Sequence, residues 1–448
     1  MDPLYNLPDG QLWLGNVLEV LDALPEKSVH CVVTSIPYWG LRDYGLKATV
    51  WGEEPDLNCE HEWVQGSRPP TKNGTEGSTD PKNQPVMGNG KIEAGSFCVH
   101  CGAWFGCLGL EPYVDLYIAN ILEVFRKVWR VLRDDGTCWV NIGDTYNAYN
   151  GGAGPSSSWK NTARDRERPH LETGYGLRVK DLKPKDMVGI PWLVALHLRV
   201  DGWYLRSDII WEKSNPMPES VSDRPTKSHE YIFLLTKKRR YFYDAEAIKE
   251  TCSENTHSRG PEYHPTPKTG EAANGVKNNE SFRKGTWGEV TSRNKRTVWT
   301  VPTQAFPGAH FATFPEDLIT PCILAGTSEK GCCPECGKPW KRIIIPSGHK
   351  NKRETAHVPN NCTTKTDSTG WKPTKIATEE WKQDCNCQPR DPEPCTVLDP
   401  FGGAGTTYRV SRSLGRHSIY IDLSEKYIKM AIEHLEKVPL HFTMNTAW

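Results

Sequence analysis

No stretch of this 448-residue sequence stays apolar over the roughly 18 to 20 residues that a membrane-spanning helix needs. The first residues, Met1 to Tyr5, also lack a basic region followed by an apolar one, the mark of a secretory signal. Net charge is absent as well, since 55 basic residues balance 55 acidic ones. We therefore expect a cytoplasmic protein with no membrane partner, in which any nucleic-acid surface depends on local clustering of charge.

Cysteine is abundant, and its pattern argues against disulfides. The count of fifteen is odd, and C-x-x-C spacings occur without a secretory signal, which favours reduced thiols that bind a metal. Two sets of four soft ligands have the spacing of a tetrahedral zinc site. The first set is Cys59, His61, Cys98 and Cys101, and the second is Cys333, Cys336, Cys385 and Cys387.

Both sets predict structural zinc, because four protein ligands leave no open position for a catalytic water. In the second set Cys332 and Cys362 are alternative ligands. The competing interpretation is buried free thiols, but the residues between the first four ligands are too polar to form a core. Zinc would fold each insert by closing its loop.

Patterns typical of helices and strands alternate along much of the chain. Continuous β-branched runs indicate strands buried on both faces, as in a parallel sheet, and apolar residues at helical spacing lie between them. Asp134-Asp135-Gly136 predicts a turn. This alternation is typical of a doubly wound α/β fold. The expected helices cover 17–24, 112–132 and 189–200, and the expected strands cover 12–14, 30–34, 137–143, 203–211 and 230–235.

Two long polar stretches interrupt the pattern, residues 146–180 and 251–297. The second holds eight Lys or Arg against five Glu, a modest positive excess. A solvated loop and a DNA-contacting loop explain it equally well.

A glycine-rich turn near the end of the chain follows a short apolar strand at 395–398. Glycines there let the backbone approach a ligand before a helix begins near Thr406. An ordinary tight turn would look similar, but the next strand, 415–422, ends in Asp422, an acid suited to ribose hydroxyls. The candidate cofactor residues of this turn are Asp399, Pro400, Phe401, Gly403, Gly405, Thr406 and Thr407.

The tetrapeptide Ser35-Ile36-Pro37-Tyr38 directly follows the apolar run 30–34, far ahead of the glycine turn. With both phrases in this order, the chain resembles the β-class DNA amino-methyltransferases, which methylate cytosine N4 or adenine N6 from S-adenosylmethionine. That class is circularly permuted, with the tetrapeptide first. The likeness extends over 108–112, 141–146, 183–186, 209–213 and 310–318, which is most of the chain outside the polar insertions.

The resemblance implies a role for each residue of the tetrapeptide. An exocyclic amino group is a poor nucleophile, so acceptors must draw its hydrogens out of the ring plane, and these would be the Ser35 hydroxyl and the Ile36 carbonyl. Tyr38 would stack on a flipped base, with Trp39 as a helper in substrate binding, and Pro37 completes the tetrapeptide.

The resemblance also implies a methionine pocket. Asp399 and the glycine loop would hold this part of S-adenosylmethionine, with Phe314 and Glu316 as weaker candidates. The methyl group would pass directly to the base, without a covalent enzyme intermediate.

The implied fold is a Rossmann-like methyltransferase sheet built from both chain ends, with two zinc-binding insertions and a polar target-recognition segment. The expected catalytic region covers 1–45 and 108–245, the first zinc insert 46–107, the target-recognition segment 246–305, the cofactor-binding part 306–330 and 391–448, and the second zinc insert 331–390.

Two departures from the family pattern stand out. Ile36 replaces a proline, which keeps the carbonyl but removes some rigidity. Gly15-Asn16 stands where many relatives have Gly-Asp.

Several alternatives stay open. Ser35 favours cytosine N4 over adenine N6, and the departures leave room for an inactive zinc-bearing DNA-binding protein. Motif order disfavours methylation of RNA or of a protein glutamine. The expected partner is double-stranded DNA, in a bacterial or phage-infected cell. A homodimer and a cognate restriction nuclease are further partners that the resemblance allows.

Overall fold

A computed structural model of the chain describes most of the sequence. The described residues are 2–40, 45–52, 59–65, 86–87, 95–147, 182–183, 185–251, 292–304, 314–344 and 379–439.

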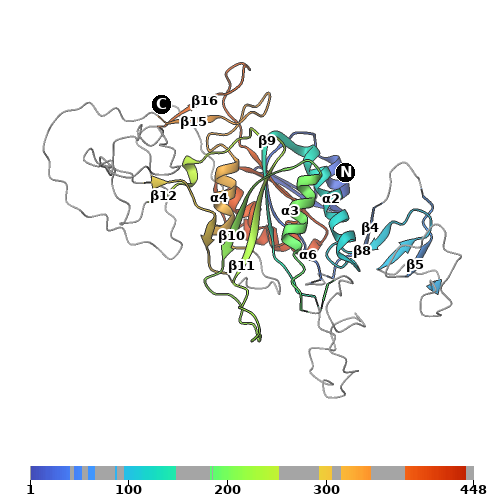
Figure 1. Ribbon diagram of the computed structural model, residues 1–448. Helices are drawn as coiled ribbons and strands as arrows, with labels where there is room; N and C mark the ends of the chain where they lie inside the picture. The colour runs from blue at the N-terminus through green and yellow to red at the C-terminus, as the bar shows by residue number, and fades with distance from the viewer. Residues whose placement is uncertain are drawn as a thin grey trace, which may run out of the picture.

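A nine-stranded sheet forms the centre of the molecule (Figure 1), in the order β1-β2-β18-β17-β3-β9-β11-β10-β14. Strands β2, β18, β17, β3 and β9 run parallel to one another, whereas β1 and β11 are antiparallel to their neighbours. The bounds are β1 Tyr5–Leu7, β2 Gly10–Leu14, β18 His417–Asp422, β17 Thr396–Asp399, β3 Val29–Ser35, β9 Leu132–Ile142, β11 His229–Thr236, β10 Tyr204–Glu212 and β14 Val298–Thr300.

Chain segments from both ends of the sequence join at the middle of this sheet. Strand β3 pairs with β17 through Cys31↔Val397 and Val32↔Leu398, across more than 360 positions of sequence. The predicted α/β fold, assembled from the two chain ends, is therefore confirmed.

Helices cover both faces of the sheet, and Figure 1 shows α3 and α4 on opposite sides of it. In β3, Val32 packs into the core under α1 to α3, while Cys31 and Val33 pack into the core under α4. This explains why the strand reads as a continuous apolar run. The bounds are α1 Val17–Ala23, α2 Val114–Val131, α3 Ile190–Val200, α4 Glu316–Gly326, α5 Thr406–Ser413 and α6 Glu425–Leu435.

The predicted turn at Asp134–Gly136 lies inside β9, which begins at Leu132. Leu132 pairs with Val29, and the next pair is Thr137 with Cys31. Four residues of β9 therefore bulge opposite a single residue of β3. The turn-forming residues do break the regular ladder, but they do so without ending the strand.

Of the three smaller sheets formed by the described residues, two belong to the cysteine inserts. The first belongs to the insert 46–107 and is antiparallel, in the order β4-β8-β7-β5-β6, while the second belongs to the insert 331–390 and pairs β15 with β16. The bounds are β4 Thr49–Trp51, β8 Trp104–Gly106, β7 Ser96–Cys98, β5 Trp63–Gln65, β6 Val86–Met87, β15 Lys341–Ile344 and β16 Glu379–Lys382.

Most of the polar stretches 146–180 and 251–297 lies outside the described residues. The described flanks of the expected target-recognition segment form the short helix η5 (Glu246–Ile248) and the strand pair β12 (Glu250–Thr251) and β13 (Ser292–Arg293). Strand β14 leaves this segment and adds to the edge of the main sheet beside β10. One end of the segment is thus part of the main sheet.

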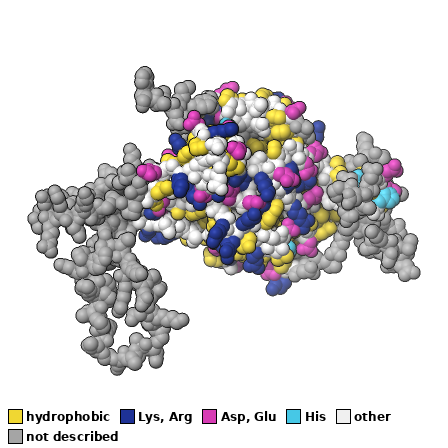
Figure 2. All heavy atoms as spheres, turned by 90° about the horizontal axis from the view of Figure 1, so that it is seen from above, with side chains coloured by type: hydrophobic (Ala, Val, Ile, Leu, Met, Phe, Trp, Pro, Cys, Tyr) yellow, Lys and Arg dark blue, Asp and Glu magenta, His cyan; other side chains and the backbone are white. Residues whose placement is uncertain are grey.

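The surface of the described part is mixed in charge. Figure 2 shows lysine and arginine side chains interspersed with acidic ones on the face it presents. Among the described helices, none has the length and apolar character to cross a membrane.

Candidate active site

The two phrases meet at the carboxyl ends of β3 and β17. Because these strands are adjacent and parallel, Ser35 and Asp399 end side by side at one edge of the sheet. A pocket opens there, between the tetrapeptide and the glycine turn. Its walls include Ser35, Ile36, Pro37, Phe314, Pro400, Phe401, Gly402, Gly403, Ala404, Thr406 and Asp422.

Glycine is required in the turn for steric reasons. Gly403 and Gly405 have φ angles of +50° and +78°, in the left-handed region that other residues avoid. A Cβ on Gly402 would lie 2.2 Å from the ring of Tyr420, whose hydroxyl donates to the Gly403 carbonyl at 2.7 Å. The turn therefore packs closely on β18 and presents its backbone to the pocket.

Asp399 shapes the turn and does not line the pocket. Its carboxylate is buried and accepts hydrogen bonds from the hydroxyls of Thr34 at 2.7 Å and Thr407 at 2.8 Å, and from the Phe401 amide at 3.1 Å. Burial raises its pKa to about 6. The expectation that Asp399 touches the cofactor is corrected: these bonds join the carboxylate to β3, to the turn and to the start of α5, so its influence on a ligand is indirect.

Asp422, at the end of β18, does face the pocket. Its two oxygens accept from the amides of Gly403 at 2.9 Å and Ser424 at 2.7 Å. Burial raises its pKa to about 7, against the effect of these amide donors. The acid predicted for ribose hydroxyls is thus at the expected strand end, tied to the glycine turn.

Contacts with the main core and with α2 hold the tetrapeptide in place. The Ile36 side chain is 1% exposed and packs in the main core, while the Pro37 carbonyl accepts from the Tyr117 hydroxyl at 2.7 Å. Ser35 lies higher, half-buried at the pocket wall. An apolar residue at position 36 therefore anchors the loop through its side chain, which offsets the missing proline ring.

Trp39 is a core residue, which corrects the expectation that it helps to bind the base. Its ring is 1% exposed, and its indole nitrogen donates to the Glu111 carbonyl at 3.0 Å. The Glu111 carboxylate in turn accepts from the Gly109 amide at 2.8 Å and from Asn120 at 2.9 Å. Burial raises the pKa of Glu111 to about 7. This network holds the chain as it leaves the tetrapeptide.

The two weaker cofactor candidates separate in the structure. Phe314 lines the pocket, whereas Glu316, at the start of α4, forms an ion pair with Arg409 and is not among the lining residues. Thr407 and Gly405 are also not among the residues that line the pocket. The Thr407 hydroxyl is bonded to Asp399, and a Cβ on Gly405 would lie 2.8 Å from Ala431.

Sequence reasoning missed one side of the pocket. Asn16 caps α1 by accepting from the Leu18 amide at 2.9 Å, and its Gly15-Asn16 phrase was the only local signal. The segments at the start and end of the first insert carry no such signal. Their sequence predicted only a zinc-binding insert. The missed lining residues are Gly15, Asn16, Val17, Leu46, Lys47, Thr49, Trp51, Cys107, Leu108, Ile421, Leu423 and Tyr427.

Both predicted cysteine sets come together. In the first, Cys59 Sγ lies 3.7 Å from Cys98 Sγ, and Cys101 Sγ lies 3.5 Å from His61 Nδ1. In each set the four ligand atoms lie within 4.8 Å of one another. Of the two alternative ligands in the second set, Cys362 is outside the described residues.

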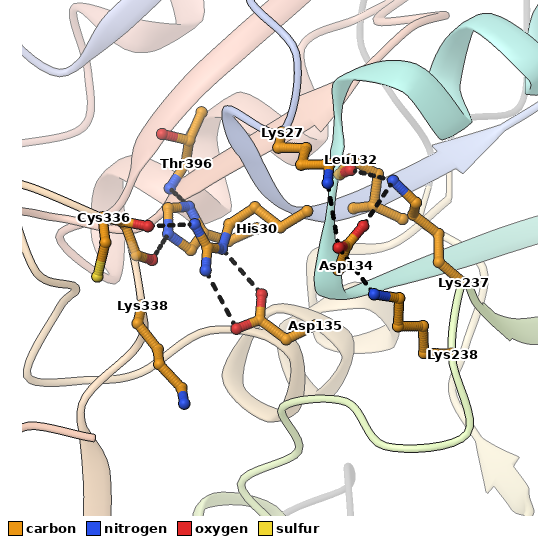
Figure 3. Close-up of polar contacts among 12 residues, drawn as sticks. Lys27, His30, Leu132, Asp134, Asp135, Lys237, Lys238, Cys336, Lys338 and Thr396 are labelled. Carbon is orange, nitrogen blue, oxygen red and sulfur yellow. Dashed lines mark hydrogen bonds and ion pairs between the residues drawn. The ribbon is translucent and has the colours of Figure 1, made fainter. Parts of the chain in front are cut away.

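The other alternative ligand, Cys332, lies in a separate buried group with His30 and Cys395. His30 Nδ1 accepts from the Thr396 amide at 3.0 Å (Figure 3). Its Nε2 lies 2.7 Å from the Gly337 carbonyl. Because both ring nitrogens are in hydrogen bonds, this group is a structural contact and not a metal site.

That contact docks the second insert on the amino ends of the strands. His30 is the second residue of β3 and Thr396 the first of β17, and Arg133 on β9 donates to the Cys336 carbonyl at 2.8 Å. Arg133 is itself fixed by Asp135 at 2.8 Å. The second cysteine set is therefore attached to the edge of the sheet opposite the pocket.

The cysteines that follow a proline, as a covalent route would require, are Cys322 and Cys395. Both are 0% exposed, and neither lines the pocket. Burial holds the pKa of Cys322 well above its usual value. The cysteine that does line the pocket, Cys107, contacts the Leu46 carbonyl at 3.3 Å and follows a glycine. Among the described residues, neither cysteine that follows a proline therefore faces the pocket.

Comparison with known proteins identifies the chain. Residues 29–333 and 392–433 match the N6_N4_Mtase family, described as DNA methylase. The chain belongs to this family. The predicted DNA amino-methyltransferase is thereby confirmed, since the match covers most of the sequence on both sides of the second insert.

Curated relatives agree with this assignment. The Type II methyltransferase M.XycI of Xanthomonas campestris pv. cyanopsidis is 37% identical over 97% of this chain and 90% of its own length. M.SmaI of Serratia marcescens is 31% identical over 96% and 92%, and M.Cfr9I of Citrobacter freundii is 38% identical over 73% and 75%. Among solved structures, the cytosine-N4-specific PvuII DNA methyltransferase is 13% identical over 97% of this chain and 93% of that chain, with a TM-score of 0.45.

Proposed function

We propose that this DNA methyltransferase transfers a methyl group from S-adenosylmethionine to the N4 amino group of a flipped cytosine in double-stranded DNA. One observation carries the proposal. Ser35 and the Ile36 backbone share a single pocket with the glycine turn and Asp422. Groups suited to a methyl donor and groups suited to an amino acceptor therefore face each other.

The residues present fit the proposed cofactor. Asp422 offers a carboxylate to ribose hydroxyls, the glycine turn lets a ligand reach the backbone, and Phe314 and Phe401 supply aromatic walls. When bound, S-adenosylmethionine supplies a methyl group activated by its sulfonium.

The tetrapeptide residues act on the acceptor amino group. The Ser35 hydroxyl and the Ile36 carbonyl accept hydrogen bonds from its two N–H groups, which draws the hydrogens out of the ring plane and frees the nitrogen lone pair. The cofactor that Asp422 and the glycine turn would hold would supply the methyl group and leave as a thioether, and the methylated nitrogen would release one proton to solvent. Tyr38 stacks on the flipped base, which compensates for part of the stacking lost from the duplex.

We also propose that each cysteine set holds one structural zinc ion. The first set offers three thiols and one imidazole, and the second four thiols, which are donor sets that zinc prefers. Zinc analysis by atomic absorption should give two ions per chain.

Cytosine is favoured because the tetrapeptide begins with serine, and adenine N6 is the second candidate. Mass spectrometry of nucleosides from DNA treated with the protein tests the choice. We expect N4-methylcytosine, and N6-methyladenine as the sole product would overturn it. No methylated nucleoside, with tritium from labelled S-adenosylmethionine also absent from DNA, would contradict the proposed reaction. A restriction nuclease as cognate partner and a homodimer stay predictions.

A further inference from the structure

From the last position of the tetrapeptide, the Tyr38 side chain reaches across β9 to the start of β11. Its hydroxyl donates to Glu230 Oε2 at 2.5 Å, with Asn141 Oδ1 at 3.1 Å. Tyr38 follows β3, whereas Glu230 lies two strands away in the sheet order. The bond thus ties the base-handling loop to a strand that contributes nothing to the pocket wall described above.

Glu230 is itself fixed at both oxygens. Lys213 Nζ lies 2.5 Å from Oε1, and the Asn141 amide donates to Oε2 at 3.3 Å. Asn141 also donates to the Tyr231 carbonyl at 3.1 Å, which anchors it to β11. The Lys213 and Glu230 side chains are only 20% and 14% exposed, so water screens their ion pair less than a surface pair.

The ring of Tyr38 is also held by shape. A Cβ on Gly143 would lie 2.7 Å from Tyr38 Cε2 and 3.4 Å from the Glu230 carboxyl carbon. Only glycine at this position lets the ring lie against the backbone where β9 ends. With the backbone on one side and a charge-assisted hydrogen bond at its tip, the ring has little rotational freedom.

We propose that Glu230 is a positioning residue for methyl transfer: it fixes the Tyr38 ring in the orientation that receives the flipped base. This inference rests on the proposed function, because it assumes that Tyr38 stacks on a base. Glu230 acts through the Tyr38 hydroxyl and does not contact the reacting amino group. An aromatic ring held in place before binding loses less entropy when the base arrives.

A double-mutant cycle tests the inference with Tyr38→Phe and Glu230→Gln. Each single change should lower kcat/KM for DNA about tenfold, as expected for one hydrogen bond to a charged group. The double variant should also lose about tenfold, because the second change removes nothing further. Affinity for S-adenosylmethionine should stay unchanged in all three. A loss of about a hundredfold in the double variant would show that Glu230 acts independently of Tyr38.

Base flipping gives a readout that a merely structural role would not move. With 2-aminopurine at the target position, both single variants should show a smaller fluorescence rise on binding than the unmodified protein. Glu212→Gln is the matched control, since Glu212 ends the neighbouring strand and accepts from Thr300 at 2.5 Å, away from Tyr38. It should behave as the unmodified protein does.

Two failures are distinguishable. No methyl transfer by the unmodified protein would contradict the proposed function, whereas full activity and flipping in Glu230→Gln would contradict only this inference. If Glu230→Gln does not fold, Lys213→Met tests the same chain of contacts. It should lower kcat/KM in the unmodified background but not in the Tyr38→Phe background, and equal losses in both would overturn the inference.

Discussion

The two cysteine inserts resemble each other in ligand chemistry but lie at opposite edges of the parallel sheet. The first contributes Leu46, Lys47, Thr49 and Trp51 to the pocket at the carboxyl ends of the strands. The second touches the amino ends, through His30 and Arg133. Since the pocket lies at the carboxyl edge, the proposed metal site should serve catalysis in the first insert and stability in the second.

The largest effect is expected at the carboxyl edge, from Ser35→Ala. Loss of one acceptor for the amino hydrogens should lower kcat about a hundredfold or more. Binding of S-adenosylmethionine and Tm should change little, because Ser35 lies at the pocket wall outside the buried core. Single-turnover kinetics measure the chemical step. Ser28→Ala is the matched control at the amino edge, where the Ser28 hydroxyl donates to the Pro25 carbonyl. Unchanged turnover in Ser35→Ala would remove Ser35 from the mechanism.

Loss of a ligand in the second insert should lower the free energy of unfolding. Cys336→Ser removes one proposed zinc ligand from the residue whose carbonyl Arg133 binds, so the contact with β9 should loosen along with the proposed metal site. We expect a loss of about 3 kcal/mol in unfolding free energy, as for other losses of a metal site. Differential scanning calorimetry measures it. If Cys336→Ser melts normally but binds the cofactor more weakly, the second insert supports the pocket and not the stability of the fold.

Loss of a ligand in the first insert should weaken the binding of S-adenosylmethionine. Cys101→Ser disturbs the sheet that carries β4, and with it Trp51, whose indole donates to the Gly106 carbonyl at 3.1 Å beside the pocket. Affinity for S-adenosylmethionine should fall about tenfold, equal to roughly 1.4 kcal/mol. Isothermal titration calorimetry checks this. Unchanged affinity together with zinc loss would separate the first metal site from the pocket.

The smallest effect concerns pH at the carboxyl edge. The pKa of Asp422 is raised to about 7 by burial, so its carboxyl is protonated below that pH and ionised above it. Because ribose hydroxyls bind the ionised form better, cofactor affinity should be full near pH 8. It should fall several-fold, by at most about tenfold, toward pH 6. Asp422→Asn should flatten this dependence, and a slope that persists in the variant would assign it to another group.

Sequence patterns predicted the elements well where one physical demand dominates. The buried strand 30–34 and the glycine turn were found because burial on both faces and positive φ angles leave few alternatives. Prediction was less complete where a residue has two compatible roles. Asp399 and Trp39 both fit ligand binding by type, yet Thr34 and Thr407 surround the first and the main core encloses the second.

The residues around Glu230 show most clearly what could not be predicted from the sequence. Its bond to Tyr38 joins positions 192 apart in sequence, and the phrase that contains it looks like an ordinary strand start. The same holds for Leu46 and Trp51, which follow no local pattern of a cofactor site. Such residues enter the site because strands far apart in sequence become neighbours.

The order of the two phrases, the strands before them and the cysteine spacings are properties of the sequence alone, and they determined the family and the fold. Local rules suffice there, because burial periodicity, glycine φ angles and ligand spacing act over a few residues. Only the tertiary structure decided that Asp399 faces inward, that the first insert walls the pocket and that Glu230 holds Tyr38. The physical reason is that these contacts cross between strands, and the partner of each side chain is set by the register of the sheet.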